Sequence, residues 1–436
     1  MYPGSPFVLA VFHFCFLALI ALIFPRPRLY VYTFLSGLLF LGFWPKVVAH
    51  TIWNIDFVEP VGDFSGSAQA WDSALLAASA GAAGIMGVRL LYLYFTRHRC
   101  LALAHALQPA PFWFVRYRRL VWLATLGLIL LLNVGNFYFA FYQIGVNPKL
   151  ILPMRLNIPI AWLINVGFAF WLAALVHWEL RAGRRTLAIS LGGPIFEAFL
   201  SSVSALSRLS YLLHTVPYWV ALWEKWHELK DSLKSRVAVL VVLFVIFFAL
   251  SIYAVFWIRA NIYYPVPVDE SFTSQLNRTI KRQVPDLVLH RWVGLEGVLA
   301  VGAVPDRGKD LLFEAVSTDP KLGVKSLYQR IAKVNFHSEN PNEFTFLANS
   351  GIVAIFLFSG SLAIVFLGLG FITTLLVGTE ICIERLLAND FMRAVAGASV
   401  ANVVAQTTFP YLTAVFFLQL WLAIAFLVAL ERAGKH

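Results

Sequence analysis

Residues 237–258 read VAVLVVLFVIFFALSIYAVFWI, a run without a single charged side chain. A helix of this length crosses the roughly 30 Å hydrocarbon core of a bilayer. The run stops at Arg259, where the polar stretch 259–343 begins, and further long apolar runs lie on both sides of that stretch. The sequence therefore predicts an all-α polytopic membrane protein with one long polar interruption.

The composition of the whole chain supports this class. Of its 436 residues, 60% are hydrophobic and only 13% are charged, whereas soluble domains have about 45–50% and about 25%. The formal net charge is +11, but the Lys and Arg residues cluster in short loops between apolar runs. That pattern is typical of cytoplasmic membrane loops, and we expect no nucleic-acid partner.

We predict about eleven transmembrane helices, with one large extracytoplasmic loop between the eighth and the ninth. Residues 50–72 contain four acidic residues and no Lys or Arg, so we place them outside, with the N-terminus outside and the C-terminus inside. Residues 344–358 are apolar but too short to cross, which favours a re-entrant or interfacial helix. The predicted spans are 6–24, 29–49, 73–95, 120–143, 157–178, 186–206, 209–224, 237–258, 362–384, 393–409 and 411–430.

Three regions follow from this topology. Residues 1–258 form a transmembrane bundle of eight spans, and residues 259–343 form the extracytoplasmic loop domain. Residues 344–436 hold the re-entrant segment and the last three spans. The chain has no P-loop, GxGxxG, HExxH or GxSxG motif, and none of its three cysteines lies in residues 259–343. We therefore expect neither a cofactor nor a metal site.

The strongest candidate for chemistry is the octet HRWVGLEG, His290 to Gly297, in the apolar middle of the polar stretch. The guanidinium of Arg291 offers a planar fork that matches phosphate oxygens. Glu296 or His290 would act as general base on a hydroxyl group. The alternative is a structural ion pair between Arg291 and Glu296 that holds the loop onto the bundle.

Further candidates rest on charge and position. Arg278, Lys281 and Arg282 form a basic cluster that would bind a diphosphate or an anionic sugar. Alternatively, the cluster is a solvated helix face or contacts lipid headgroups. Arg208 lies between two short apolar runs, where it would bind an anion or extend to the membrane surface. His337 precedes the short apolar segment and is either a site residue or an ordinary loop histidine.

The layout and the segment Arg291–Val298, RWVGLEGV, resemble bacterial polysaccharide polymerases of the O-antigen polymerase (Wzy-like) type. They also resemble membrane proteins of exopolysaccharide clusters, such as those for xanthan-like gums, and of lipopolysaccharide clusters. Arg291 and Glu296 match that segment, and Arg208 lies where these families often carry an arginine.

This resemblance implies a metal-independent glycosyltransferase in the bacterial inner membrane. Its substrates would be oligosaccharide repeats linked to undecaprenyl diphosphate, and its partners membrane lipids, a flippase, and chain-length or export proteins. Three alternatives stay open: a transporter or flippase of lipid-linked oligosaccharide, an O-antigen ligase-like transferase, and a non-catalytic assembly partner.

Overall fold

The computed structural model describes residues 2–97, 110–182, 187–224, 231–263, 291–334 and 343–433. Every regular element in these ranges is a helix, and the only β-type pairing there is a pair of isolated bridges that involve residues 143, 146 and 344. The elements are α1 (Pro6–Ala21), α2 (Tyr30–Ile52), α3 (Ala68–Thr96), α4 (Phe112–Phe139), η1 (Pro153–Arg155), α5 (Asn157–Trp162), the π-helical η2 (Leu163–Gly167), α6 (Phe168–Arg181), α7 (Leu187–Ser204), α8 (Arg208–Glu224), α9 (Asp231–Tyr263), α11 (Leu295–Gly302), α12 (Lys309–Ser317), η5 (Pro320–Lys325), α13 (Leu327–Ile331), α14 (Ile352–Leu357), α15 (Leu362–Leu387), α16 (Asp390–Ala405) and α17 (Pro410–Ala433).

Seven helical segments in the described ranges are long and apolar enough to cross a membrane: α2, α3, α4, η1 through α6, α9, α15 and α17. In α4, α9 and α17 only 22%, 22% and 17% of the most apolar window is buried within the protein. Apolar surface on this scale is stable against lipid and not against water. The prediction of an all-helical polytopic membrane protein is therefore confirmed.

Each of the eleven predicted spans coincides with a helix of the structure. The boundaries differ most at α4, which begins at Phe112 and not at residue 120, because the basic turn around Arg118 is also helical. The two short runs on either side of Arg208 are α7 and α8, as predicted. The count of eleven membrane crossings and the sidedness of the loops stay predictions.

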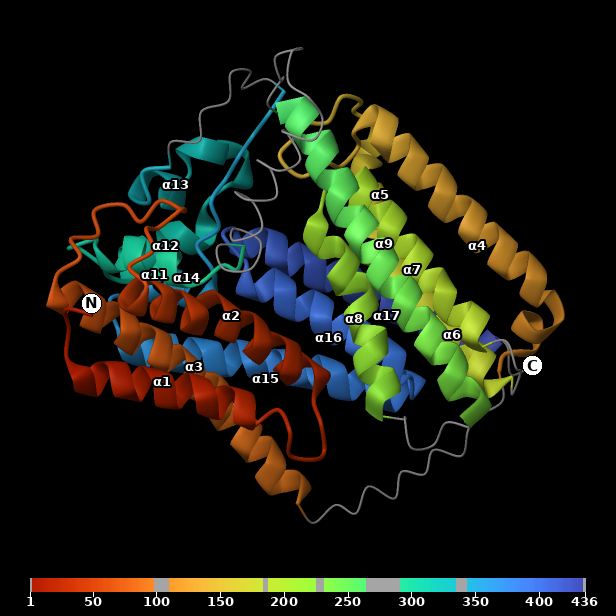
Figure 1. The fold of residues 1–436 in the computed structure, drawn as a ribbon, viewed down its shortest axis with the longest axis horizontal. Coiled ribbons are helices and arrows are strands. Elements are labelled where there is room, and N and C mark those ends of the chain that lie inside the picture. The colour runs from red at the N-terminus through yellow and green to blue at the C-terminus, as the bar shows by residue number, and fades with distance from the viewer. Residues whose placement is uncertain are drawn as a thin grey trace.

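The helices form two groups that meet at α16 (Figure 1). One group contains α1, α2, α3 and α15, and the other contains α4 to α9. Helix α16 packs against α2 and α15 of the first group, α6 and α8 of the second, and α17. Half of the residues of α16 are buried Ala or Val, so the neighbouring helices can approach it closely.

A polar network fastens the end of the bundle at which α2 begins. The carboxylate of Glu380 accepts hydrogen bonds from the backbone N–H groups of Tyr30 (3.0 Å) and Val31 (2.8 Å). These N–H groups have no partner within the helix, and a carboxylate there also interacts favourably with the helix dipole. Arg393 completes the network with an ion pair to Glu380 at 3.0 Å.

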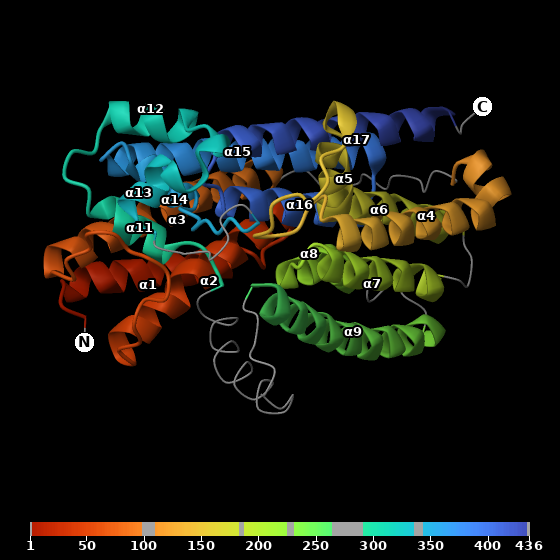
Figure 2. The same cartoon turned by 90° about the horizontal axis from the view of Figure 1, so that it is seen from above.

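The four short helices α11 to α14 cover the opposite end of the first group, and we call them the cap (Figures 1 and 2). The predicted short apolar segment begins as extended chain and then forms the buried helix α14. Hydrogen bonds from the Ser350 and Gly351 N–H groups to Thr408 Oγ1 (3.0 Å) and to the Thr407 carbonyl (3.1 Å) join it to the turn between α16 and α17.

Candidate functional site

Helix α11 enters the bundle deeply, as its apolar sequence predicts. All its residues from Leu295 to Val301 are buried. Its start lies against Gly42, where an added Cβ would come within 2.1 Å of the Val293 carbonyl oxygen. Gly42 precedes the end of α2 by ten residues, or about 15 Å at 1.5 Å per residue. The octet therefore reaches about halfway down α2, and glycines make this close backbone contact possible.

A buried ion pair fixes α11 to α2. The Lys46 ammonium donates to both carboxylate oxygens of Glu296, each at 2.6 Å. The two residues are 1% and 3% exposed, so water reaches neither charge. Glu296 thus has Lys46 as its partner, and the structure shows no ion pair between Glu296 and Arg291. The predicted alternative, an ion pair between Arg291 and Glu296, is therefore wrong in its cation, because Lys46 takes that place.

Arg291 lies where the chain enters the bundle, and its side chain is half-buried. Within the described ranges its guanidinium has no ion pair. Burial and the neighbouring positive charge of Arg259 lower the pKa of Arg291 to about 10, and the charge of Glu59 opposes this shift. The group is still cationic at neutral pH. A partly desolvated cation beside a second cation is a favourable place for an anion.

The end of α9 brings Arg208 toward the same place. Arg208, the first residue of α8, stacks on the ring of Phe256 with 4.5 Å between the guanidinium carbon and the ring centroid. Phe256 and Arg259 are three residues apart on α9 and share a helix face. Two of the arginines proposed from the sequence, Arg208 and Arg291, therefore both lie near the last turns of α9.

Glu59 is the carboxylate that sequence reasoning did not select. It is half-buried in the loop between α2 and α3, and the charges of Glu296, Lys46 and Arg291 all act on it. Burial, followed by repulsion from Glu296, raises the pKa of Glu59 above its usual value. Burial, followed by the charges of Glu296 and Glu59, raises the pKa of Tyr328 on α13.

A backbone contact fixes the loop that carries Glu59. The Gly62 N–H donates to the Ala332 carbonyl at 3.2 Å. Gly62 has φ +63°, and an added Cβ would lie 2.4 Å from the Ile331 carbonyl oxygen. Glycine is therefore required here for both conformation and space. The loop, α11 and α13 thus bring Glu59, Glu296 and Tyr328 within electrostatic reach of one another.

Signals for the missed residues were present in the sequence. Lys46 is an ionisable residue inside an apolar run, which implies a buried partner or a functional role. Glu59 lies in the acidic segment 50–72 beside the predicted membrane surface. Neither position shows which distant residue it meets. The remaining sequence candidates, His290, Arg278, Arg282 and His337, lie outside the described residues.

A second buried acid–base pair lies within the helices. Glu197 of α7 contacts His214 Nδ1 of α8 at 3.0 Å and accepts a hydrogen bond from the Ser201 hydroxyl at 2.6 Å. The other ring nitrogen of His214 is 2.6 Å from the carbonyl oxygen of Asn165 in the π-helical turn η2. Both ring nitrogens are thus engaged within the protein, which indicates that the pair holds α7, α8 and η2 together.

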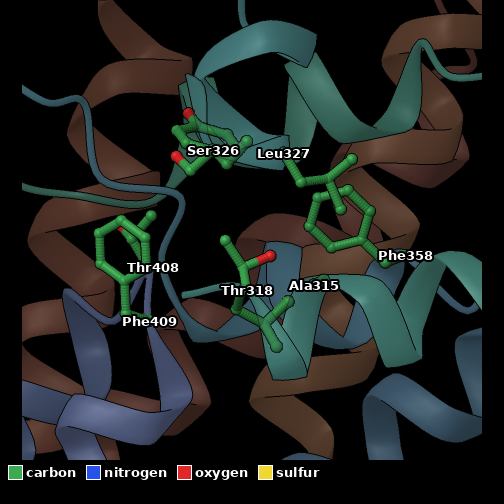
Figure 3. A pocket seen from close by; sticks show the side chains of 9 residues that line it. Ala315, Thr318, Ser326, Leu327, Phe358, Thr408 and Phe409 are labelled. Carbon is green, nitrogen blue, oxygen red and sulfur yellow. The ribbon is translucent and has the colours of Figure 1, made fainter. Parts of the chain in front are cut away.

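Two cavities elsewhere in the described part of the chain do not suit a charged substrate. A cavity of about 10 Å³ between α12, α13 and the turn before α17 holds about one water molecule (Figure 3). Ser326 lines it, and the buried Ser326 hydroxyl has no hydrogen-bond partner there. A cavity of about 520 Å³ between α4, α6 and α17 is apolar, with Gln419 among its few polar side chains. It suits lipid chains and has no charged group for a phosphate.

No three His, Cys, Asp or Glu side chains in the described part of the chain come together as a metal site. In comparisons with known proteins, no family model, no curated protein and no solved structure matches the chain.

Proposed function

We propose that the protein is a metal-independent glycosyltransferase that polymerises oligosaccharide repeats carried on undecaprenyl diphosphate. We place the reaction at the periplasmic face of the bacterial inner membrane. The observation that carries the proposal is the half-buried Arg291 guanidinium. It stays cationic, forms no ion pair within the described ranges, and lies where a segment from the polar stretch enters an apolar bundle.

This arrangement supports the proposed substrate class. A lipid-linked diphosphate joins an apolar chain to two phosphates, and it needs a cation at the boundary between lipid and water. Arginine matches phosphate oxygens with two parallel hydrogen bonds. Removing the anion from water strengthens its attraction to the guanidinium. Arg259 and Arg208 extend the cationic region along the end of α9 and α8.

The proposed reaction transfers the growing glycan to a new repeat. A hydroxyl oxygen of the acceptor sugar attacks the anomeric carbon of the glycan. The bond between that carbon and the diphosphate oxygen breaks, and undecaprenyl diphosphate leaves with the electron pair. Arg291 stabilises the charge that develops on the leaving group. The hydroxyl proton passes to a carboxylate.

Glu59 is our candidate for that carboxylate. It is half-buried, it lies within the electrostatic reach of Arg291, and its raised pKa brings it closer to the range in which a general base works best. Glu296, the sequence candidate, has both oxygens bound to Lys46, so we assign it a positioning role. His290 stays a further candidate from the sequence.

The test is polymer formation in proteoliposomes supplied with purified lipid-linked repeats. We expect Arg291→Ala to reduce the rate by about 10²–10³-fold, as loss of one group that stabilises a transition state does in other enzymes. Arg291→Lys keeps the charge but lacks the planar fork, and we expect a smaller loss. The matched control is Arg330→Ala, because Arg330 is an exposed cap arginine paired with Glu314.

Three outcomes would change the assignment. A full polymer ladder from Arg291→Ala would remove this arginine from the site. Movement of cargo across the membrane without new glycosidic bonds would identify a flippase. Transfer of finished glycan to a lipid acceptor, without polymerisation, would identify a ligase.

A further inference from the structure

The cap exposes several large apolar side chains on α12 and η5. Phe313 is 70% exposed, and Leu322 and Val324 are 50% and 54% exposed. Val316, one turn after Phe313, is also exposed. These residues belong to the polar stretch of the sequence, where water would be the expected surroundings. Four large apolar side chains within twelve residues mark an interaction surface and not scattered exposure.

The opposite face of α12 is already occupied. Ala315 is buried, Leu311 and Leu312 pack against the core, and the helix contacts α14 and α17. At 100° per residue, Phe313 lies about 160° around the helix from Leu311 and Ala315 and about 100° from Leu312, so it points away from the centre of the packed face. Its exposure therefore follows from the orientation of a well-packed helix and does not reflect loose packing.

The surface continues onto the membrane-facing helices. Gly308 directly precedes α12, and Phe358 lies shortly before the start of α15. The Gly308 N–H donates to the Phe358 carbonyl at 3.0 Å. The first turn of α17 exposes Tyr411 (63%) and Leu412 (49%). Figure 2 shows α12 at the same edge of the molecule as α15 and α17. The apolar surface of the cap thus joins the apolar belt of two helices that span the membrane.

Charges on the surface balance, which favours contact with lipid chains over contact with a charged partner. Three lysines and three acidic residues lie between residues 309 and 325, so this segment has no formal net charge. A segment of nine helical residues is far too short to cross a bilayer. Amphipathic helices of this kind lie in the interface with their apolar side chains among the upper parts of the lipid tails. The charged residues are Lys309, Asp310, Glu314, Asp319, Lys321 and Lys325.

We propose that residues 309–325 form an interfacial anchor, with Phe313 and Leu322 inserted into the lipid leaflet at the cap end of the bundle. The partner is the lipid surface itself. This inference rests on the cap and the bundle alone and is independent of the proposed glycosyl transfer.

Photolabelling of the full-length protein in proteoliposomes tests the anchor. The probe is a phospholipid that carries a diazirine in the upper part of one acyl chain, and labelled peptides are identified by mass spectrometry. We expect labels on residues 309–325 and on the first turns of α17, which serve as the internal reference. Phe313→Asp should reduce labelling of 309–325 several-fold and leave labelling of α17 unchanged. The exposed polar residue Lys333 gives the control variant, Lys333→Asp, which should leave both signals unchanged.

The lipid composition separates apolar insertion from electrostatic adsorption. Because the segment has no net charge, labelling should be the same with and without an anionic phospholipid. Labelling that requires the anionic lipid would overturn the proposal, and so would labels on α17 with none on 309–325. Crosslinks between two copies of the chain through Phe313, in place of lipid labels, would assign the surface to a homomeric contact.

Discussion

Removing one partner of the Lys46–Glu296 pair should destabilise the protein strongly. Both charges are shielded from water, and each oxygen of Glu296 lies 2.6 Å from the ammonium. Breaking a buried pair in this way costs about 3–5 kcal/mol, because the remaining charge has no solvent and no partner. Replacing both partners by apolar side chains of similar size is often neutral. We therefore expect Lys46→Met and Glu296→Met to be unstable and the double variant to approach the wild type.

The expected shift in the unfolding midpoint can be worked out from the chain length. An unfolding entropy of about 2.1 cal/mol/K per residue gives roughly 0.9 kcal/mol/K for 436 residues. A loss of 3–5 kcal/mol then lowers the midpoint by about 3–6 °C if the chain unfolds as one unit. Thermal unfolding in detergent, followed by loss of near-UV circular dichroism, measures this shift.

The same variants separate a positioning role of Glu296 from a catalytic one. If Glu296 only positions α11, the stable double variant should polymerise lipid-linked repeats at a rate close to that of the wild type. A double variant that is stable but inactive would restore Glu296 as general base. Single variants with unchanged midpoints would refute the buried ion pair itself.

Three further predictions follow from the described contacts. If Glu59 is the general base, the polymerisation rate should increase with pH as Glu59 loses its proton. Glu59→Gln should remove this pH-dependent activity. The raised pKa means that the folded state binds the proton of Glu59 more tightly than the unfolded state does. The contribution of Glu59 to the free energy of unfolding therefore falls as pH rises. Glu59→Gln should thus not lower the unfolding midpoint at neutral pH. Gly297→Ala would place a Cβ 1.9 Å from the Ser350 carbonyl oxygen. It should lower the free energy of unfolding by about 1–3 kcal/mol, as measured by chemical denaturation. Glu380→Gln should lower the midpoint by weakening the network at the start of α2, with unchanged activity per folded molecule.

Local features of the sequence predicted the helices well. Apolar runs of about 20 residues satisfy their backbone hydrogen bonds internally wherever they are placed, so each run forms a helix whatever its neighbours. The short helices α12 and α13 also form where apolar residues recur at helical spacing around Asp310 and Tyr328. The order of packing around α16 carried no comparable signal, because Ala and Val residues fit many partners.

The candidate site was predicted in part. The structure places Gly294 to Gly297 of the octet in the buried part of the bundle, as their apolar character predicts, and Arg291 at its edge. The alternative interpretation, a structural pair between Arg291 and Glu296, rested on their closeness in the chain. In the structure α11 begins at Leu295, so Arg291 precedes the helix and the two side chains do not share a helix face. Lys46 is 250 residues from Glu296, a separation at which spacing rules give no information.

The pairing of Glu296 with Lys46 instead of Arg291 bears directly on the proposed function. If Glu296 were bound to Arg291, the guanidinium would already have an anion, and a phosphate would have to displace a buried carboxylate. Because Lys46 binds Glu296, Arg291 has no ion pair within the described ranges, which is the arrangement that the proposed phosphate binding requires. Loss of Lys46 alone would leave Glu296 without its cation. Arg291 is a cation on the same segment, so Glu296 would then compete with a phosphate for Arg291. Lys46→Met should therefore lower activity beyond its effect on stability, whereas the double variant, which has no carboxylate at position 296, should recover the activity.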